Sequence, residues 1–179
     1  MSDIHKIETR LRDLVNATRQ LHSLYADKVR WNIVCSAMDV IGDTELAIQE
    51  YDKIRKVESN HGGSYLIVYG ILQIMFVQQD AVRNLAKALG LEFDLPTELI
   101  EIRDLRTAFI GHPTEHRRGG IISSGYISRP TLNPSGFQFL RTSSTGPDQW
   151  GYVNIPELIV KQYNRIRELL GKAVTHESP

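Results

Sequence analysis

The chain has 179 residues, of which 41% are hydrophobic, and its 21 Lys and Arg balance 21 Asp and Glu. This composition excludes a collagen-like or wholly disordered protein, and the balanced charge gives the chain as a whole no attraction to nucleic acid or anionic membranes. The single cysteine, Cys35, excludes an intramolecular disulfide, and the first residues lack the apolar run of a secretory signal. We therefore expect a cytoplasmic protein, not bound to membranes, in which any nucleic-acid site is a local patch.

Apolar residues recur every three or four positions through the first part of the chain, as they do on one face of a helix. This spacing predicts one helix from Ile4 to Tyr25 and a second from Trp31 to Ile41. The sequence Gly42-Asp43-Thr44 is typical of a helix end followed by a new N-cap. A third helix is therefore predicted from Thr44 to about Val57.

The most hydrophobic stretch, Ser64 to Leu89, is apolar almost all round the helical wheel. Its apolar run is shorter than the roughly 20 residues of a membrane span, so we expect a buried helix in the middle of a bundle, closed by Gly90. The next helix is predicted from Thr97 to Ile110, with Gly111 in the left-handed conformation at its end and Pro113 preventing its continuation. The apolar faces of such a bundle fit either an intramolecular core or a homodimer interface.

The composition changes between Gly119 and Pro156, which hold six of the thirteen glycines and four of the seven prolines. Short apolar stretches between turn residues predict a small antiparallel hairpin or three-stranded flap, with a disordered loop as the alternative. Asn154 and Glu157 form a capping pair for a last helix. The prediction is a mainly α fold, in which residues 1–179 form one domain of up-and-down helices with a β-flap at 119–156 before the last helix.

The segment from Ile102 to Arg118 carries the residues that indicate chemistry. Arg103 and Arg106 lie three apart, on one helical face, and His112 follows where Gly111 and Pro113 end the helix. We expect the imidazole to lie beneath the Arg106 guanidinium. A guanidinium binds phosphate through two parallel donors, and histidine exchanges protons near neutral pH. The pair is therefore suited to holding a phosphate and deprotonating a ribose hydroxyl.

Structural roles remain open for the same residues. His112 would then cap helix carbonyls, and Arg106 would pair with Asp104, Glu101 or Glu115. The triplet His116-Arg117-Arg118, expected on a loop, either extends a basic rim along an RNA backbone or is ordinary solvated surface. We expect no cofactor and no metal site, because Pro113 removes the helix that would align His112 with His116.

The flap contains five aromatic residues that are suited either to stacking on nucleic-acid bases or to packing the flap itself. They are Tyr126, Phe137, Phe139, Trp150 and Tyr152.

An arginine followed after five residues by a histidine at a helix end, here Arg106 to His112 and then Pro113, resembles the HEPN superfamily of nucleotide-binding domains. The long apolar helix before the motif and the helix that closes the domain are similar to the architecture of that superfamily. The resemblance implies a metal-independent endoribonuclease, in which the ribose 2′-hydroxyl attacks the adjacent phosphate. Arg106 would bind that phosphate and His112 would transfer protons, while Arg103, His116, Arg117 and Arg118 would contact the RNA.

The resemblance also implies a homodimer in which two motifs share one cleft, and a role in prokaryotic stress or defence, as a toxin with an antitoxin or another partner protein. Thr107 stands where active members of the superfamily often carry Asn, Asp or His. A non-catalytic module that binds a nucleotide, RNA or a protein is therefore the alternative, and a dimerising helical adaptor is a third interpretation.

Overall fold

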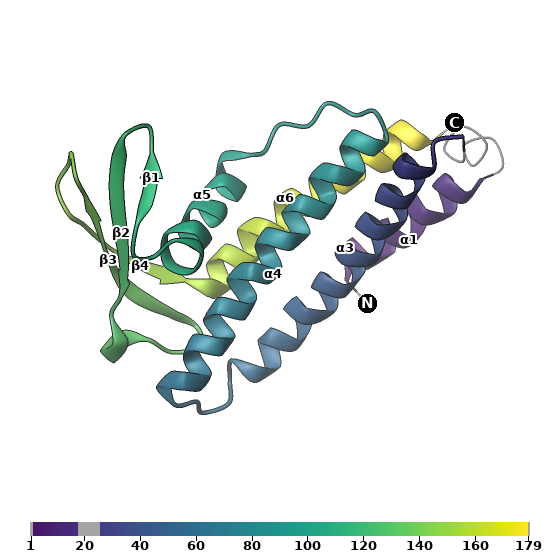
Figure 1. Ribbon diagram of the computed structural model, residues 1–179. Coiled ribbons are helices and arrows are strands. Elements are labelled where there is room, and N and C mark those ends of the chain that lie inside the picture. Colours follow the sequence, from purple (N-terminus) through teal and green to yellow (C-terminus); the bar gives the residue numbers. More distant parts are fainter. Residues whose placement is uncertain (1, 18–25, 179) are drawn as a thin grey trace.

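A computed structural model describes residues 2–17 and 26–178 and confirms a mainly α fold with a small antiparallel sheet before the last helix (Figure 1). The long helices α3 (Lys28–Ile54), α4 (His61–Ala88) and α6 (Ile155–Glu177) lie alongside one another, and α1 (Asp3–Asn16) packs on α3 and α6. The short helix α5 (Thr97–Arg106) packs on α4 and α6 near the sheet. One hydrophobic core joins the helices to the inner side of the sheet.

Two predicted helix boundaries are wrong. The helix expected to end before Gly42 continues through it, and the Thr44 hydroxyl donates to the carbonyls of Val40 and Ile41 instead of capping a new helix. The packing of α3 along α4 therefore outweighs the local preference for a stop. At the start of the chain α1 ends at Asn16, because Ala17 is extended. The rest of that predicted helix, including Leu21 and Tyr25, lies outside the described residues.

Helix α4 occupies the predicted central position and packs on α3, α5 and α6. Contrary to the sequence expectation, its length and composition are sufficient for a membrane span, as they also are in core helices of soluble proteins. Its fully buried residues include Gln78 and Gln79, which are satisfied in part by Gln162 of α6. The Gln162 amide donates to Gln78 Oε1 at 2.9 Å and accepts from Gln79 Nε2 at 2.7 Å. These hydrogen bonds fix the register of α6 on α4.

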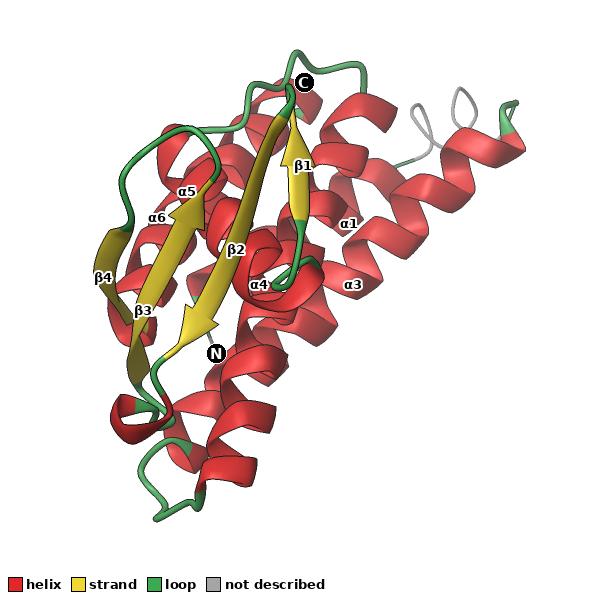
Figure 2. Ribbon diagram, turned by 60° about the vertical axis from the view of Figure 1, so that its left-hand side comes forward, coloured by secondary structure: helices red, strands yellow, loops and turns green. Residues whose placement is uncertain are grey.

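The sheet has four strands, one more than the largest number expected: β1 (His116–Arg118), β2 (Ile121–Ile127), β3 (Gly136–Ser143) and β4 (Gln149–Asn154). All neighbours are antiparallel, in the order β1-β2-β3-β4 (Figure 2). Gly119 and Gly120 both have positive φ, of 57° and 82°, which a tight two-residue hairpin turn requires. This turn adds a strand before the predicted flap. The capping pair of α6 is confirmed, because Asn154 Oδ1 accepts from the Glu157 amide.

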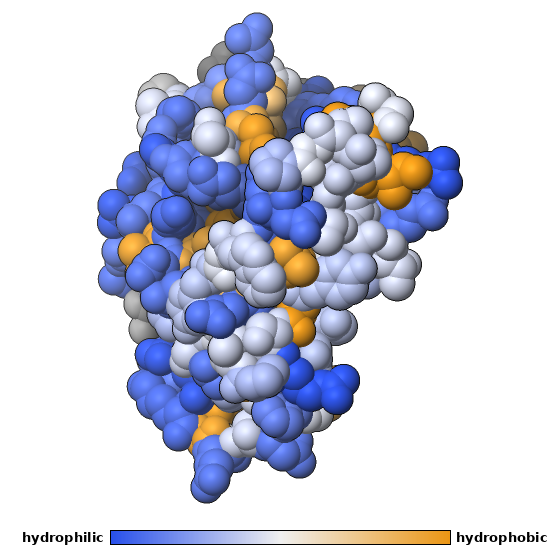
Figure 3. Space-filling view, turned by 90° about the vertical axis from the view of Figure 1, so that its left-hand side faces the viewer, coloured by the Kyte–Doolittle hydropathy of each residue, from blue (hydrophilic) through white to orange (hydrophobic). Residues whose placement is uncertain are grey.

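The two faces of the sheet differ. On the inner face Phe137 and Phe139 pack on the ring of Phe109, which follows α5, with ring centres 5.5 and 4.8 Å away. On the outer face Tyr126 and Trp150 are 56% and 73% exposed. The flap aromatics are therefore divided between core packing and solvent. Figure 3, which looks onto the sheet end of the molecule, shows separate hydrophobic groups among hydrophilic ones.

Candidate functional site

The motif begins where α5 widens into a single turn of π-helix, η1 (Thr107–Gly111). The His112 amide donates to the Thr107 carbonyl at 2.9 Å, and His112 then leaves helical geometry with φ −140° and ψ 58°. The sequence prediction of a left-handed Gly111 is wrong, because positive φ occurs at four other glycines of the described ranges and not at Gly111. Single π turns of this kind often occur at functional sites.

The side chain of Arg106 packs against Gly111. A Cβ atom built on Gly111 would lie 2.7 Å from Arg106 Nη1, closer than a side chain allows. The guanidinium therefore packs against the residue that directly precedes His112. It is held there by a 2.9 Å hydrogen bond from Arg106 Nε to Gln73 Oε1 and by the Phe76 ring, whose centre is 4.6 Å from Cζ.

Arg106 keeps an uncompensated positive charge. Its side-chain hydrogen bond goes to the neutral amide of Gln73, whereas Glu101 pairs with Lys161 and Glu115 pairs with Arg117. The pairing of Arg106 with a carboxylate, considered above as a structural role, does not occur among the described residues. A half-buried guanidinium bonded only to a neutral amide retains donors for an anion.

Arg103 also packs on the Phe76 ring, but unlike Arg106 it is paired with a carboxylate. Its Cζ is 4.0 Å from the ring centre, and its Nη1 donates to Asp80 Oδ1 at 2.9 Å. The same oxygen of Asp80 is 3.0 Å from Nη2 of Arg83. Arg103 is thus tied to α4, and its predicted contact with RNA has to compete with Asp80.

His112 is exposed, and its ring stacks on that of His116, with ring centres 6.0 Å apart and planes inclined by 27°. No hydrogen bond joins either ring to another group in the part of the chain that the structure describes. In the same part of the chain no three His, Cys, Asp or Glu side chains are close enough to hold a metal ion. The arrangement therefore presents two adjacent imidazoles next to the turn that holds Arg106.

The triplet His116-Arg117-Arg118 forms strand β1, and its predicted place on a loop is wrong. Side chains alternate along a strand, so His116 and Arg118 point to one face while Arg117 points to the other. Arg117 pairs with Glu115, and the hydrogen bond from its guanidinium holds the pKa of the Glu115 carboxyl below its usual value. The basic rim considered above as one interpretation of this triplet is therefore split between the two faces of the sheet.

Two pockets flank Arg141, a residue of β3 that the sequence analysis did not select. The first, which we call the inner-face pocket, lies on the inner face of the sheet and has a volume of about 400 Å³. Its polar lining residues are His116, Arg118, Ser123, Arg141, Ser143 and Gln149. The α5–α6 pocket, of about 460 Å³, shares Arg141 and Gln149 with it and also contains carboxylates and a lysine: Glu101, Asp104, Glu157 and Lys161. The available signal was that Arg141 is one of only three charged residues between Gly119 and Pro156.

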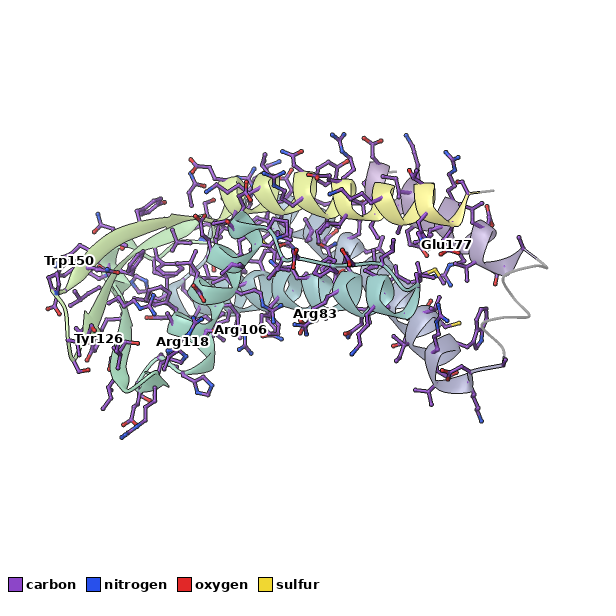
Figure 4. All side chains as sticks on the ribbon, turned by 90° about the horizontal axis from the view of Figure 1, so that it is seen from above. Arg83, Arg106, Arg118, Tyr126, Trp150 and Glu177 are labelled. Atoms are coloured by element: carbon purple, nitrogen blue, oxygen red, sulfur yellow. The ribbon has the colours of Figure 1, made fainter. Side chains whose placement is uncertain are left out.

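Gln73 and Phe76 were also missed, although Gln73 is a polar interruption in the most hydrophobic stretch of the chain. Both lie on α4 and contact the Arg106 guanidinium, Gln73 through a hydrogen bond and Phe76 through its ring. In Figure 4 the labelled side chains of Arg118, Arg106 and Arg83 follow one another along one side of the molecule, from the sheet toward the middle of the bundle. Tyr126 and Trp150 lie at the far end of the sheet in the same view.

Comparison with models of known protein families, with curated proteins and with solved structures found no match to this chain. The comparisons therefore assign it no family.

Proposed function

We propose that the protein is a metal-independent endoribonuclease of the HEPN-like type, with its reaction centre at Arg106, His112 and His116. The observation that carries this proposal is the position of the Arg106 guanidinium. It packs against Gly111, the residue before His112, and has no carboxylate partner among the described residues, while the exposed His112 ring stacks on that of His116. Arginine, histidine and solvent access are the requirements of phosphodiester cleavage without metal.

In the proposed reaction Arg106 binds the non-bridging oxygens of the scissile phosphate and stabilises the negative charge that grows there. His112, as the neutral imidazole, takes the proton from the ribose 2′-hydroxyl, whose oxygen forms a new bond to phosphorus. The bond from phosphorus to the 5′-oxygen breaks, and His116, as the imidazolium, gives that oxygen a proton. The products are a 2′,3′-cyclic phosphate and a 5′-hydroxyl, and atoms and charge balance without water or metal.

The test is incubation of the purified protein with a mixed RNA, with and without a chelator. Cleavage is expected in both conditions, with cyclic phosphate ends and a bell-shaped dependence of rate on pH. Arg106→Ala and His112→Ala should each lower the rate at least about 100-fold, as the loss of a charge-stabilising or proton-transferring group does. Arg10→Ala, at an exposed position of α1, is the matched control and should retain the activity. Cleavage that needs metal, or that persists in both site variants, contradicts the proposal.

Gly111→Ala is a sharper variant, because it removes none of the reacting groups. The backbone of Gly111 does not have positive φ, so alanine fits the backbone while its Cβ displaces the guanidinium. The expected result is a lower cleavage rate with unchanged folding, measured by circular dichroism. Gly42→Ala is the control, since nothing lies within 4 Å of a Cβ at that helical position.

The alternative is a non-catalytic module that binds RNA or a nucleotide at the same residues. The specific observation in its favour is that no described residue hydrogen bonds to either imidazole, whereas catalytic bases are usually oriented by a third group. Intact RNA together with salt-sensitive binding that Arg106→Ala abolishes would select this alternative.

The proposed assembly is a homodimer. An apolar groove between α3 and α4 includes Val29 and Ile33, which are 69% and 40% exposed, and reaches Asp80 beside Arg103. Light scattering of the full chain measures its mass in solution, and a monomeric mass with full activity contradicts a shared cleft. An antitoxin or other partner protein is likewise a proposal, tested by co-purification from the native host.

A further inference from the structure

The inner-face pocket lies on the side of the sheet that packs on the helices. It begins at the first row of paired residues that the helices no longer cover. A Cβ built on Gly125 would lie 2.4 Å from the Ala108 carbonyl oxygen, so the π turn reaches that row of the sheet. The next row of the same face consists of His116, Ser123 and Ser143, which are paired across three strands. This row is open, and the pocket forms above it.

The strand register brings donors of several kinds together. Arg141 is paired with Gly125 on one side and with Gln149 on the other. Because Gly125 has no side chain, the Arg141 guanidinium meets no opposing group from β2 and can turn toward the hydroxyls of the neighbouring row. Arg118, at the end of β1, also lines the pocket.

The charge of this pocket is not balanced. Its lining has two guanidiniums and an imidazole but no carboxylate. The side chains of Arg118 and Arg141 form no hydrogen bond or ion pair with any residue of 2–17 or 26–178. Arg141 is half-buried, and its positive charge has no partner of opposite sign among these residues. The carboxylates of the α5–α6 pocket lie beyond Arg141, and none of them comes within ion-pair distance of it.

We propose that this pocket binds a phosphodiester group of the RNA backbone, next to the phosphate held by Arg106. Arg141 and Arg118 donate to its oxygens, with the hydroxyls of Ser123 and Ser143 as further donors. The inference rests on the proposed function, because His116 belongs to both places: it lines the pocket and stacks on His112. An RNA strand that passes from Arg106 over His116 therefore brings its neighbouring phosphate to Arg141.

The test measures binding of a fluorescent 2′-O-methyl RNA, which has no free 2′-hydroxyl and cannot be cut by the proposed reaction. Arg141→Gln in the full chain should weaken binding by about tenfold or more, the usual effect of losing a hydrogen-bonded charge, and lower the dependence of log affinity on log salt by about one. Arg129→Gln, an exposed arginine of the same flap, should change affinity less than twofold. Ser143→Ala removes a donor without a charge and should weaken binding without changing the salt dependence.

The inference is overturned if Arg141→Gln and Ser143→Ala both bind within twofold of the unmodified chain. It is also overturned if affinity depends on a 5′-terminal phosphate of the RNA, because the pocket would then hold a monoester and not the backbone. Its outcome is separable from that of the nuclease proposal. Loss of binding in Arg141→Gln with no cleavage of ordinary RNA keeps the pocket and rejects the enzyme, and cleavage with unaltered binding in Arg141→Gln does the reverse.

Discussion

Arg103 and Arg141 are both half-buried arginines near the junction of bundle and sheet, but their surroundings differ. Arg103 lies on a helix, packs on Phe76 and is neutralised by Asp80 of α4. Arg141 lies on a strand opposite a glycine and has no partner among the described residues. The comparison shows that the neighbouring helix α4 supplies a carboxylate for Arg103, whereas no described residue supplies one for Arg141 at the end of the sheet.

The largest effect is expected from a substitution that removes the packing between the helical bundle and the sheet. Phe109 is 1% exposed and contacts both Phe137 and Phe139, so Phe109→Ala should lower the free energy of unfolding by about 3–5 kcal/mol. Urea unfolding followed by circular dichroism measures this change. Tyr126→Ala, at an exposed aromatic of the outer face, is the control and should change stability by less than about 0.5 kcal/mol. Equal effects of the two substitutions would contradict the packing described.

Asp80→Asn removes the carboxylate partner of Arg103, so that Arg103, like Arg141, has no ion pair. The substitution removes a carboxylate that two arginines share, and since Asp80 is 30% exposed the expected loss is about 1–2 kcal/mol, between surface and buried ion pairs. RNA binding at low salt should tighten, because Arg103 gains an uncompensated charge. Asp52→Asn, at an exposed ion pair of α3, is the control. Unchanged RNA affinity in Asp80→Asn would show that Arg103 does not face the RNA.

Tyr51→Phe tests a polar link between the bundle and the flap. The buried Tyr51 hydroxyl donates to the Pro134 carbonyl at 2.9 Å, so its removal should cost about 1 kcal/mol. Burial raises the pKa of Tyr51 from 10.0 to about 12, which means that the folded protein favours the protonated phenol. This contribution is fully present below pH 10.0 and is lost as the pH rises toward about 12. Alkaline unfolding should therefore lose part of its pH dependence in Tyr51→Phe, and an identical pH profile would contradict this reasoning.

The smallest effect is expected at Glu98, whose carboxylate neutralises Arg165 across the contact of α5 with α6. The hydrogen bond from Arg165 lowers the pKa of Glu98, so the pair stabilises the fold above the usual carboxyl pKa of 4.5 and ceases to do so as the pH falls below it. Glu98→Gln should lower the thermal unfolding temperature slightly at neutral pH and not in acid. A decrease of equal size at both pH values would indicate lost packing instead of lost charge.

Helices and the capping pair at Asn154 could be predicted from sequence, because apolar spacing and capping act within a few residues. The failures involve distant partners. The continuity of α3 through Gly42 depends on its packing along α4, and β1 is a strand only because a glycine turn folds it onto β2. In the site, spacing identified Arg106 and His112, but the half-buried, unpartnered state of Arg141 follows from a strand register that no local pattern encodes.

The π turn limits which length changes the chain can accept. A π turn holds about one residue more than an α-helical turn, so deleting one residue between Thr107 and Gly111 would restore ordinary helical winding and leave the following imidazole at roughly its present angle. An insertion has no such compensation and would rotate the imidazole by about 100°, the turn of one helical residue. Natural or designed variants that retain this surface should therefore tolerate the loss of one residue in the turn more readily than the gain of one.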